Sequence, residues 1–337
     1  MKLNLAKIKE ITLGAVNIKE ENSCFYFDRF TNEQKELYKK TNENFYMKTF
    51  STSGIKFSFK TDSKSLFLKI KTQKGSSRTY FSVDVFIDGK ILGYLDNFSD
   101  KELKRNYTTP EYELGEFKKS FDLGDGEKNI CIHLPWSVET IIEEISIDDN
   151  SFVEGVKPSK RFIAYGDSIT HGYDALRPSN RYVARIAKML DAEEVNRGIG
   201  GEKFFPLLVS KKDSFVPDYI TVAYGSNDWN FIDEETFKNN CRNFYLNLVK
   251  NYPETTIFAI TPIWRKDMND EKEFGEFKKI EEDIKDIVKE FDNIKLISGF
   301  DFVPHDENYF GDLYLHPNDE GFKHYAENLY HKIIESI

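Results

Sequence analysis

A serine, a histidine and an aspartate stand at positions where a hydrolase could use them together. Ser168 ends the Gly-Asp-Ser tripeptide 166–168, which directly follows the apolar run 162–165, and Asp312 and His316 lie near the other end of the chain. A buried strand that breaks into a turn at a serine presents the hydroxyl at the edge of a sheet, where a histidine can take its proton. These side chains indicate nucleophilic acyl transfer, with Ser168 as the nucleophile and His316 as the base.

Two further blocks offer donors for the negative charge that develops on a carbonyl oxygen. Residues 196–202 read Asn-Arg-Gly-Ile-Gly-Gly-Glu and residues 225–229 read Gly-Ser-Asn-Asp-Trp, each after a candidate strand. Backbone N–H groups and side-chain amides aimed at such an oxygen stabilise the transition state. The sequence therefore predicts an oxyanion hole built from the N–H of Ser168, the N–H of a glycine in the first block and the amide of Asn227.

The first half of the chain has the period-two alternation of β-strands. Short alternating runs lie between residues 44 and 149, with hairpin-type Asp-Gly pairs at 88–89 and 125–126. Several short strands at this spacing predict an all-β sandwich. We expect it to form an accessory domain over residues 1–155.

The second half changes to a rhythm of strand, loop and helix, which predicts an α/β/α three-layer domain over residues 159–337 with a mostly parallel five-stranded sheet. The candidate strands are residues 161–165, 194–196, 219–224, 256–260 and 294–297, and the helical patterns are residues 181–190, 234–251, 271–291 and 319–334. Because parallel strands end at a common edge, where sites gather, the blocks around Ser168 and Asn227 should meet there.

Composition limits the partners and the compartment. Of the net charge of −10 over 337 residues, about −9 falls after residue 150, which argues against nucleic acid and anionic membranes as partners. Cys24, Cys131 and Cys241 have neither a disulfide nor a zinc-ligand spacing. We see no signal peptide or transmembrane segment. We therefore expect a cytoplasmic protein that uses no metal or other cofactor.

The blocks resemble those of the SGNH (GDSL) hydrolases, in the order of that family and over roughly residues 161–337. The resemblance implies a flavodoxin-like SGNH hydrolase domain with Ser168 as nucleophile, His316 as base, and Gly201 and Asn227 as oxyanion donors beside the N–H of Ser168. A sandwich ahead of such a domain is similar to the architecture of the family two carbohydrate esterases, which are acetyl esterases. That resemblance implies a jelly-roll-like sandwich.

One spacing departs from the family pattern. The family has Asp-x-x-His, whereas Asp312 stands four residues before His316 and Leu313 occupies the usual position. Asp312 can still orient the imidazole if the loop bulges, or a backbone carbonyl can take its place, as in some two-domain members of the family. We keep Asp312 as the predicted third member of the triad, because a neutral histidine needs an acceptor that fixes its tautomer.

Other residues near the blocks have two interpretations each. Trp229 and Trp264 follow candidate strands, and we predict that they form walls of an acyl or sugar pocket, with packing beneath loops as the alternative. His305 is the rival base, and His171 is expected to be solvated or to cap a helix. Three acidic residues of the blocks are expected to hold loops by accepting from backbone N–H groups: Asp167, Asp228 and Glu202.

These expectations combine into a serine esterase that hydrolyses small acyl esters, chiefly acetyl esters of O-acetylated carbohydrate, through an acyl-serine intermediate. The expected partner is a small-molecule or oligosaccharide ester, and homo-oligomerisation stays open. One alternative is a carbohydrate-binding protein in which the extra residue before His316 has disabled the triad. The other is a short-chain lipid acyl esterase of the lysophospholipase type.

Overall fold

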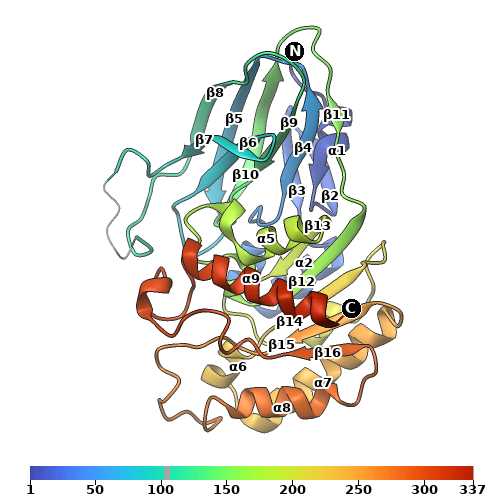
Figure 1. Cartoon of the computed structure of the whole chain (residues 1–337), viewed down its shortest axis with the longest axis vertical. Coiled ribbons are helices and arrows are strands. Elements are labelled where there is room, and N and C mark those ends of the chain that lie inside the picture. Colours follow the sequence, from blue (N-terminus) through green and yellow to red (C-terminus); the bar gives the residue numbers. More distant parts are fainter. Residues whose placement is uncertain (102–106, 337) are drawn as a thin grey trace.

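Two antiparallel sheets make up the first half of the chain. The computed structural model describes residues 1–101 and 107–336, and Figure 1 shows these two sheets above a third one. One has the order β1-β4-β9-β6-β7, with β11 paired to β4: β1 (Thr12–Leu13), β4 (Lys56–Thr61), β6 (Ser82–Ile87), β7 (Lys90–Asp96), β9 (Lys128–His133) and β11 (Glu154–Gly155). The other has the order β2-β3-β10-β5-β8: β2 (Asn17–Glu21), β3 (Cys24–Asp28), β5 (Ser65–Lys74), β8 (Glu116–Asp122) and β10 (Val138–Ile147).

The alternating pattern of these strands produces the sandwich. In β5 the apolar residues Leu66, Leu68 and Ile70 are fully buried, while the residues between them are partly exposed. Their side chains join one apolar cluster with those of the facing sheet, including Phe57 and Ile132. Because successive side chains of a strand point to opposite faces, this alternation buries one face of each sheet. The prediction of a β-sandwich is confirmed.

The third sheet is parallel throughout and has the order β13-β12-β14-β15-β16. Its strands are β12 (Lys160–Gly166), β13 (Ala192–Gly198), β14 (Tyr219–Ala223), β15 (Thr256–Ile260) and β16 (Ile294–Ile297). Counted along the chain this is the order 2-1-3-4-5, which is the flavodoxin-like arrangement. The predicted fold class of the second half is confirmed.

Helices cover both faces of the parallel sheet (Figure 1). The helices α7 (Glu234–Asn251) and α8 (Lys279–Val288) contribute to the apolar cluster on one face, and α5 (Tyr182–Met189) and α9 (Asp319–Ser336) to the cluster on the other. In α9 the buried residues Phe322, Tyr325, Leu329 and Ile333 recur at helical spacing. That spacing turns one stripe of the helix towards the sheet.

One helix is shorter than the sequence pattern predicts. The pattern favours a helix over 271–291, but α8 begins only at Lys279 and ends at Val288. Gly275 has a φ of +100°, which a right-handed helix cannot contain, and its carbonyl accepts a hydrogen bond from Nε1 of Trp229. This tertiary contact overrides the local propensity. The sequence pattern also gave no indication of α1 (Leu5–Ile11), α2 (Asn32–Thr41) and α3 (Glu43–Lys48).

The change from antiparallel to parallel sheets falls between β11 and β12, at residues 156–159. The division into domains 1–155 and 159–337 stays a prediction, because both apolar clusters around the parallel sheet also contain side chains from the first half. In residues 1–101 and 107–336, no helix has both the length and the apolarity needed to cross a membrane.

Arg29, between β3 and α2, connects the first half to the parallel sheet. Its buried guanidinium donates to the backbone oxygens of Asn196, at 2.9 Å, and Gly198, at 3.2 Å, both in β13. The same group donates to the carbonyls of Ser51 and Lys48 at 2.8 and 3.0 Å. Burial lowers the pKa of Arg29 to about 9. A charged donor this deep is stable only because each acceptor lies in place.

Substituting Arg29 by methionine should destabilise the whole protein. The change leaves two buried carbonyls of β13 without a donor, so we expect a loss of about 3 kcal/mol in the free energy of unfolding. Denaturant unfolding measures it, with Arg242→Met as the control, because Arg242 forms an exposed ion pair with Glu290. Equal unfolding of both variants and the wild type would contradict this role of Arg29.

Candidate active site

Ser168 is the first residue of the short helix α4 (Ser168–His171), which Asp167 alone separates from the end of β12. Asp167 caps this helix by accepting from the N–H of Ile169 at 3.0 Å. At Gly166 an added Cβ would lie 2.1 Å from Oγ1 of Thr170, so only glycine fits beneath the turn. The resulting geometry places Oγ of Ser168 2.8 Å from Nε2 of His316.

Asp312 lies on the other side of the imidazole. Its Oδ2 is 2.6 Å from Nδ1 of His316, and its Oδ1 accepts from the N–H groups of Tyr314, Leu315 and His316 at 2.9, 2.8 and 3.1 Å. The extra residue, Leu313, takes up the left-handed conformation with a φ of +60°. This turn shortens the path along the loop, and a carboxylate therefore reaches the imidazole despite the longer spacing.

A second carboxylate, Asp174, also faces the imidazole and was not predicted. Its Oδ2 lies 3.5 Å from Nδ1 of His316, and the side chain is fully buried. Burial disfavours the charged imidazole, but hydrogen bonds to Asp174 and Asp312 outweigh it and raise the pKa of His316 to about 9. No local pattern around residue 174 indicates this contact.

The candidate oxyanion donors lie on the loops that flank Ser168. Because β12 pairs with β13 on one side and β14 on the other, the loops that follow these three strands are neighbours. Gly201, with a φ of +87°, follows β13. Asn227 lies in α6 (Ser226–Phe231) after β14, and its amide nitrogen donates to the carbonyl of Glu202 at 3.0 Å. This amide has a second N–H for an oxyanion.

Buried carboxyl groups support these loops from below. Oε2 of Glu202 accepts from the hydroxyl of Tyr224 at 2.8 Å, and Oδ1 of Asp228 accepts from the N–H of Phe204 at 3.1 Å. Burial raises the pKa of Glu202 to about 8, that of Asp228 to about 7 and that of Asp167 to about 6. Asp167 and Asp228 accept from backbone N–H groups as expected, whereas Glu202 accepts from a side-chain hydroxyl instead.

Trp229 is not placed to form a pocket wall, contrary to the sequence expectation. Only 1% of it is exposed, its ring packs edge-on against Phe277 with centroids 5.0 Å apart, and its Nε1 donates to Gly275. A ring covered in this way packs beneath a loop and offers no face to a substrate. Trp264 is partly buried and stacks on His305 with centroids 5.6 Å apart. Its role in substrate binding stays a prediction.

Two other histidines and one tyrosine near the site differ in their surroundings. His171 is fully buried and its Nε2 lies 2.8 Å from Oγ of Ser51, so the expectation of a solvated or capping residue is wrong. The rival base, His305, contacts the carbonyl of Phe300 at 3.2 Å. Tyr314, which no motif of the sequence indicates, is 38% exposed and lies two residues before His316.

Three side chains around the imidazole come close together. The ligand atoms of Asp174, Asp312 and His316 lie within 4.8 Å of one another. Their acceptors are already engaged, since Arg78 donates to both oxygens of Asp174 and three N–H groups donate to Asp312. We assign no metal ligands among the described residues, and the expected lack of a cofactor stays a prediction.

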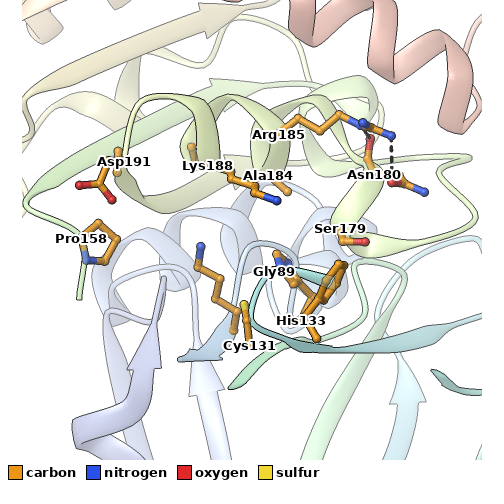
Figure 2. A pocket seen from close by; sticks show the side chains of 14 residues that line it. Gly89, Cys131, His133, Pro158, Ser179, Asn180, Ala184, Arg185, Lys188 and Asp191 are labelled. Carbon is orange, nitrogen blue, oxygen red and sulfur yellow. Dashed lines mark hydrogen bonds between the residues drawn. The ribbon is translucent and has the colours of Figure 1, made fainter. Parts of the chain in front are cut away.

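A crevice of about 330 Å³ lies elsewhere, between α5 and the sandwich. Figure 2 shows Lys188 and Arg185 of α5 on one side of it and Cys131 and His133 of β9 on the other. No residue of the predicted site lines this crevice. The candidate active site is therefore defined by the hydrogen-bonded side chains at the sheet edge.

The sequence of the second half now identifies its family. Residues 164–324 match the profile of the GDSL-like Lipase/Acylhydrolase family. This part of the chain is a GDSL-like hydrolase domain. This domain supports a carboxylic ester hydrolase. No significant match to this chain is found among curated protein sequences.

Solved structures share the fold of both halves. A salicylyl-acyltransferase from a tetracycline biosynthetic pathway superposes with a TM-score of 0.75 at 18% identity, over 96% of this chain and 94% of its own. A family two carbohydrate esterase from Clostridium thermocellum, in complex with cellohexaose, gives 0.65 at 15% identity, over 93% and 98%. An acetyl xylan esterase from the rumen bacterium Butyrivibrio proteoclasticus gives 0.59 at 16% identity, over 85% and 91%.

The raised pKa of His316 predicts a pH profile. A general base must be neutral in the free enzyme, so kcat/KM should rise with pH and reach half its maximum near pH 9. In Asp312→Asn the imidazolium loses a carboxylate partner, so the half-maximum should move to lower pH while kcat falls by orders of magnitude. Initial rates over pH 6–10 measure both. A half-maximum below pH 6 in the wild type would exclude this assignment.

Proposed function

We propose that the protein is a serine esterase that removes small acyl groups, first of all acetyl groups, from O-acetylated carbohydrate. The observation that carries the proposal is the hydrogen-bonded series Ser168, His316 and Asp312, with distances of 2.8 and 2.6 Å. It supplies a nucleophile, a base within reach of its proton and an acceptor for the base. The proposal assigns Ser168, His316 and Asp312 these three roles.

In the first half-reaction, Oγ of Ser168 attacks the ester carbonyl and Nε2 of His316 takes the hydroxyl proton. The negative oxygen is stabilised by the N–H groups of Ser168 and Gly201 and by the amide of Asn227. The C–O bond to the alcohol breaks, and the departing oxygen takes the proton from His316. Water then attacks the acyl-serine while His316 accepts its proton. The C–Oγ bond breaks, Oγ of Ser168 takes the proton back from His316, and the acid leaves.

Several observations support the assignment of a carbohydrate substrate. Two of the structures that share this fold are a carbohydrate esterase in complex with cellohexaose and an acetyl xylan esterase. The side chain of Tyr314 is 38% exposed, its backbone N–H donates to Oδ1 of Asp312, and its ring lies 5.9 Å from the guanidinium of Arg265. An aromatic ring stacks well on the apolar face of a sugar. We assign Tyr314, rather than the buried Trp229, as the aromatic contact of the sugar.

The complete geometry argues against the catalytically impaired alternative. The extra residue before His316 is taken up at Leu313 without loss of the contact between Asp312 and the imidazole.

An acyl-serine intermediate can also react with an alcohol instead of water, which transfers the acyl group to that alcohol. Comparing the products with and without added sugar alcohol separates hydrolysis from acyl transfer.

Ser168→Ala and His316→Ala should each reduce kcat for p-nitrophenyl acetate by about 10⁴-fold or more, because each removes a group that no other residue replaces. Acetate release from acetylated oligosaccharides, short-chain esters and lysophospholipids, measured with the same proteins, then ranks the substrates. We expect the oligosaccharides to have the highest kcat/KM. Equal slow release by the wild type and both variants would contradict the esterase, and preference for lysophospholipid would contradict the substrate class.

A further inference from the structure

The Nδ1 side of His316 faces two carboxylates rather than one. Oδ2 of Asp312 is 2.6 Å away and Oδ2 of Asp174 is 3.5 Å away. Asp174 follows α4 with a φ of +69° and packs against the loop that carries Asp312, where an added Cβ on Gly311 would lie 2.7 Å from its Cβ. A buried carboxylate beside a second one is costly unless a cation compensates.

Arg78 of the sandwich half supplies that cation. Its Nε donates to Oδ1 of Asp174 at 2.8 Å and its second terminal nitrogen donates to Oδ2 at 3.2 Å. The hydroxyl of Tyr107 donates to the backbone oxygen of Asp174 at 2.5 Å. The ring of Tyr173 lies below the guanidinium, at 5.5 Å, and also contacts the imidazole, with centroids 5.5 Å apart.

We propose that Asp174 is a second positioning residue for His316 and that Arg78 of the sandwich half sets the charge next to the base. The inference rests on the proposed role of His316. Two carboxylates and one guanidinium leave about one net negative charge near Nδ1, which stabilises the imidazolium formed in each half-reaction. The sandwich therefore takes part in catalysis through electrostatics. The charged and titratable groups around the imidazole come from its own loop, from both ends of α4 and from the first half of the chain: Asp312, Asp167, Tyr173, Asp174, and Arg78 behind Asp174.

The sign of the charge change provides the test. Asp174→Asn removes a negative charge, so the half-maximum of the kcat/KM profile should move to lower pH by about one unit. Arg78→Gln removes a positive charge and should move it to higher pH by a similar amount. Arg78→Lys keeps the charge and should restore the wild-type position. A purely structural role would lower rates at all pH values without shifts of opposite sign, which would overturn the proposal.

A second readout separates this proposal from the proposed function. The titration of the His316 imidazole can be followed by NMR in the Ser168→Ala background, where no turnover is needed. The same opposite shifts are expected there for Asp174→Asn and Arg78→Gln, with thermal melting as a check that each variant is folded. If the titration of His316 shifts in opposite directions but the protein that retains Ser168 has no esterase activity, only the proposed function is refuted. Activity with unshifted titration would refute the role of Asp174 and Arg78 alone.

An independent observation concerns the oxyanion hole. Lys48, at the end of α3 in the first half, is buried and donates from Nζ to the carbonyl oxygen of Gly200 at 2.6 Å. None of the described peptide bonds is cis, and in a trans peptide the C=O and the following N–H point in opposite directions. Because Nζ of Lys48 holds the oxygen of Gly200, the N–H of Gly201 in the same peptide points away from Lys48.

We infer that Lys48 is a positioning residue for the oxyanion donor Gly201. Lys48→Met should lower kcat about 10-fold with little change in KM, because the donor meets a full negative charge only in the transition state. The affinity for a boronic acid, which forms a tetrahedral adduct with the serine, should fall in parallel. A rise in KM alone would instead make Lys48 a contact of the substrate and contradict the inference. Unchanged kcat and boronate affinity would also contradict it.

Discussion

The whole site depends on one requirement of the imidazole of His316, which must keep a proton on Nδ1 while Nε2 faces Ser168 at 2.8 Å. A neutral imidazole can satisfy this only if an acceptor holds the Nδ1 proton and a rigid loop fixes the ring. Asp312 provides the acceptor and its second oxygen ties the loop together through three backbone N–H groups. One carboxylate thus fixes the tautomer and the loop at the same time.

The sandwich half reaches this site at three places. Arg29 binds the carbonyls at the end of β13, Lys48 holds Gly200 in the loop that follows, and Arg78 pairs with Asp174 beside the imidazole. Each of the three cations has at least one partner in the second half, and Arg29 and Lys48 are buried. We interpret the sandwich as a structural part of the hydrolytic site, because the loops of the parallel sheet carry oxygens that need these donors.

The sequence indicates the parts of the molecule that have a local pattern. The alternation of β5 predicts the sandwich, and the apolar runs followed by Gly-Asp-Ser and Gly-Ser-Asn predict strand ends with exposed polar groups. Asp174 has no such signal, since its importance comes from Arg78, 96 residues away in sequence. The local sequence predicts a pocket wall at Trp229 and a solvated or capping side chain at His171, but distant segments cover both. The missing start of the helix over 271–291 has the same cause, because Trp229 and the φ of Gly275 fix a loop there.

The proposed mechanism requires Ser168 to carry the acyl group during turnover. Mass spectrometry of the protein, quenched in acid within the first turnover of p-nitrophenyl acetate and digested, tests it directly. We expect an acetyl group on the peptide that contains Ser168, and none in protein left to complete the reaction. An acetyl group on another residue, or a burst of nitrophenol with no acetylated Ser168, would contradict it.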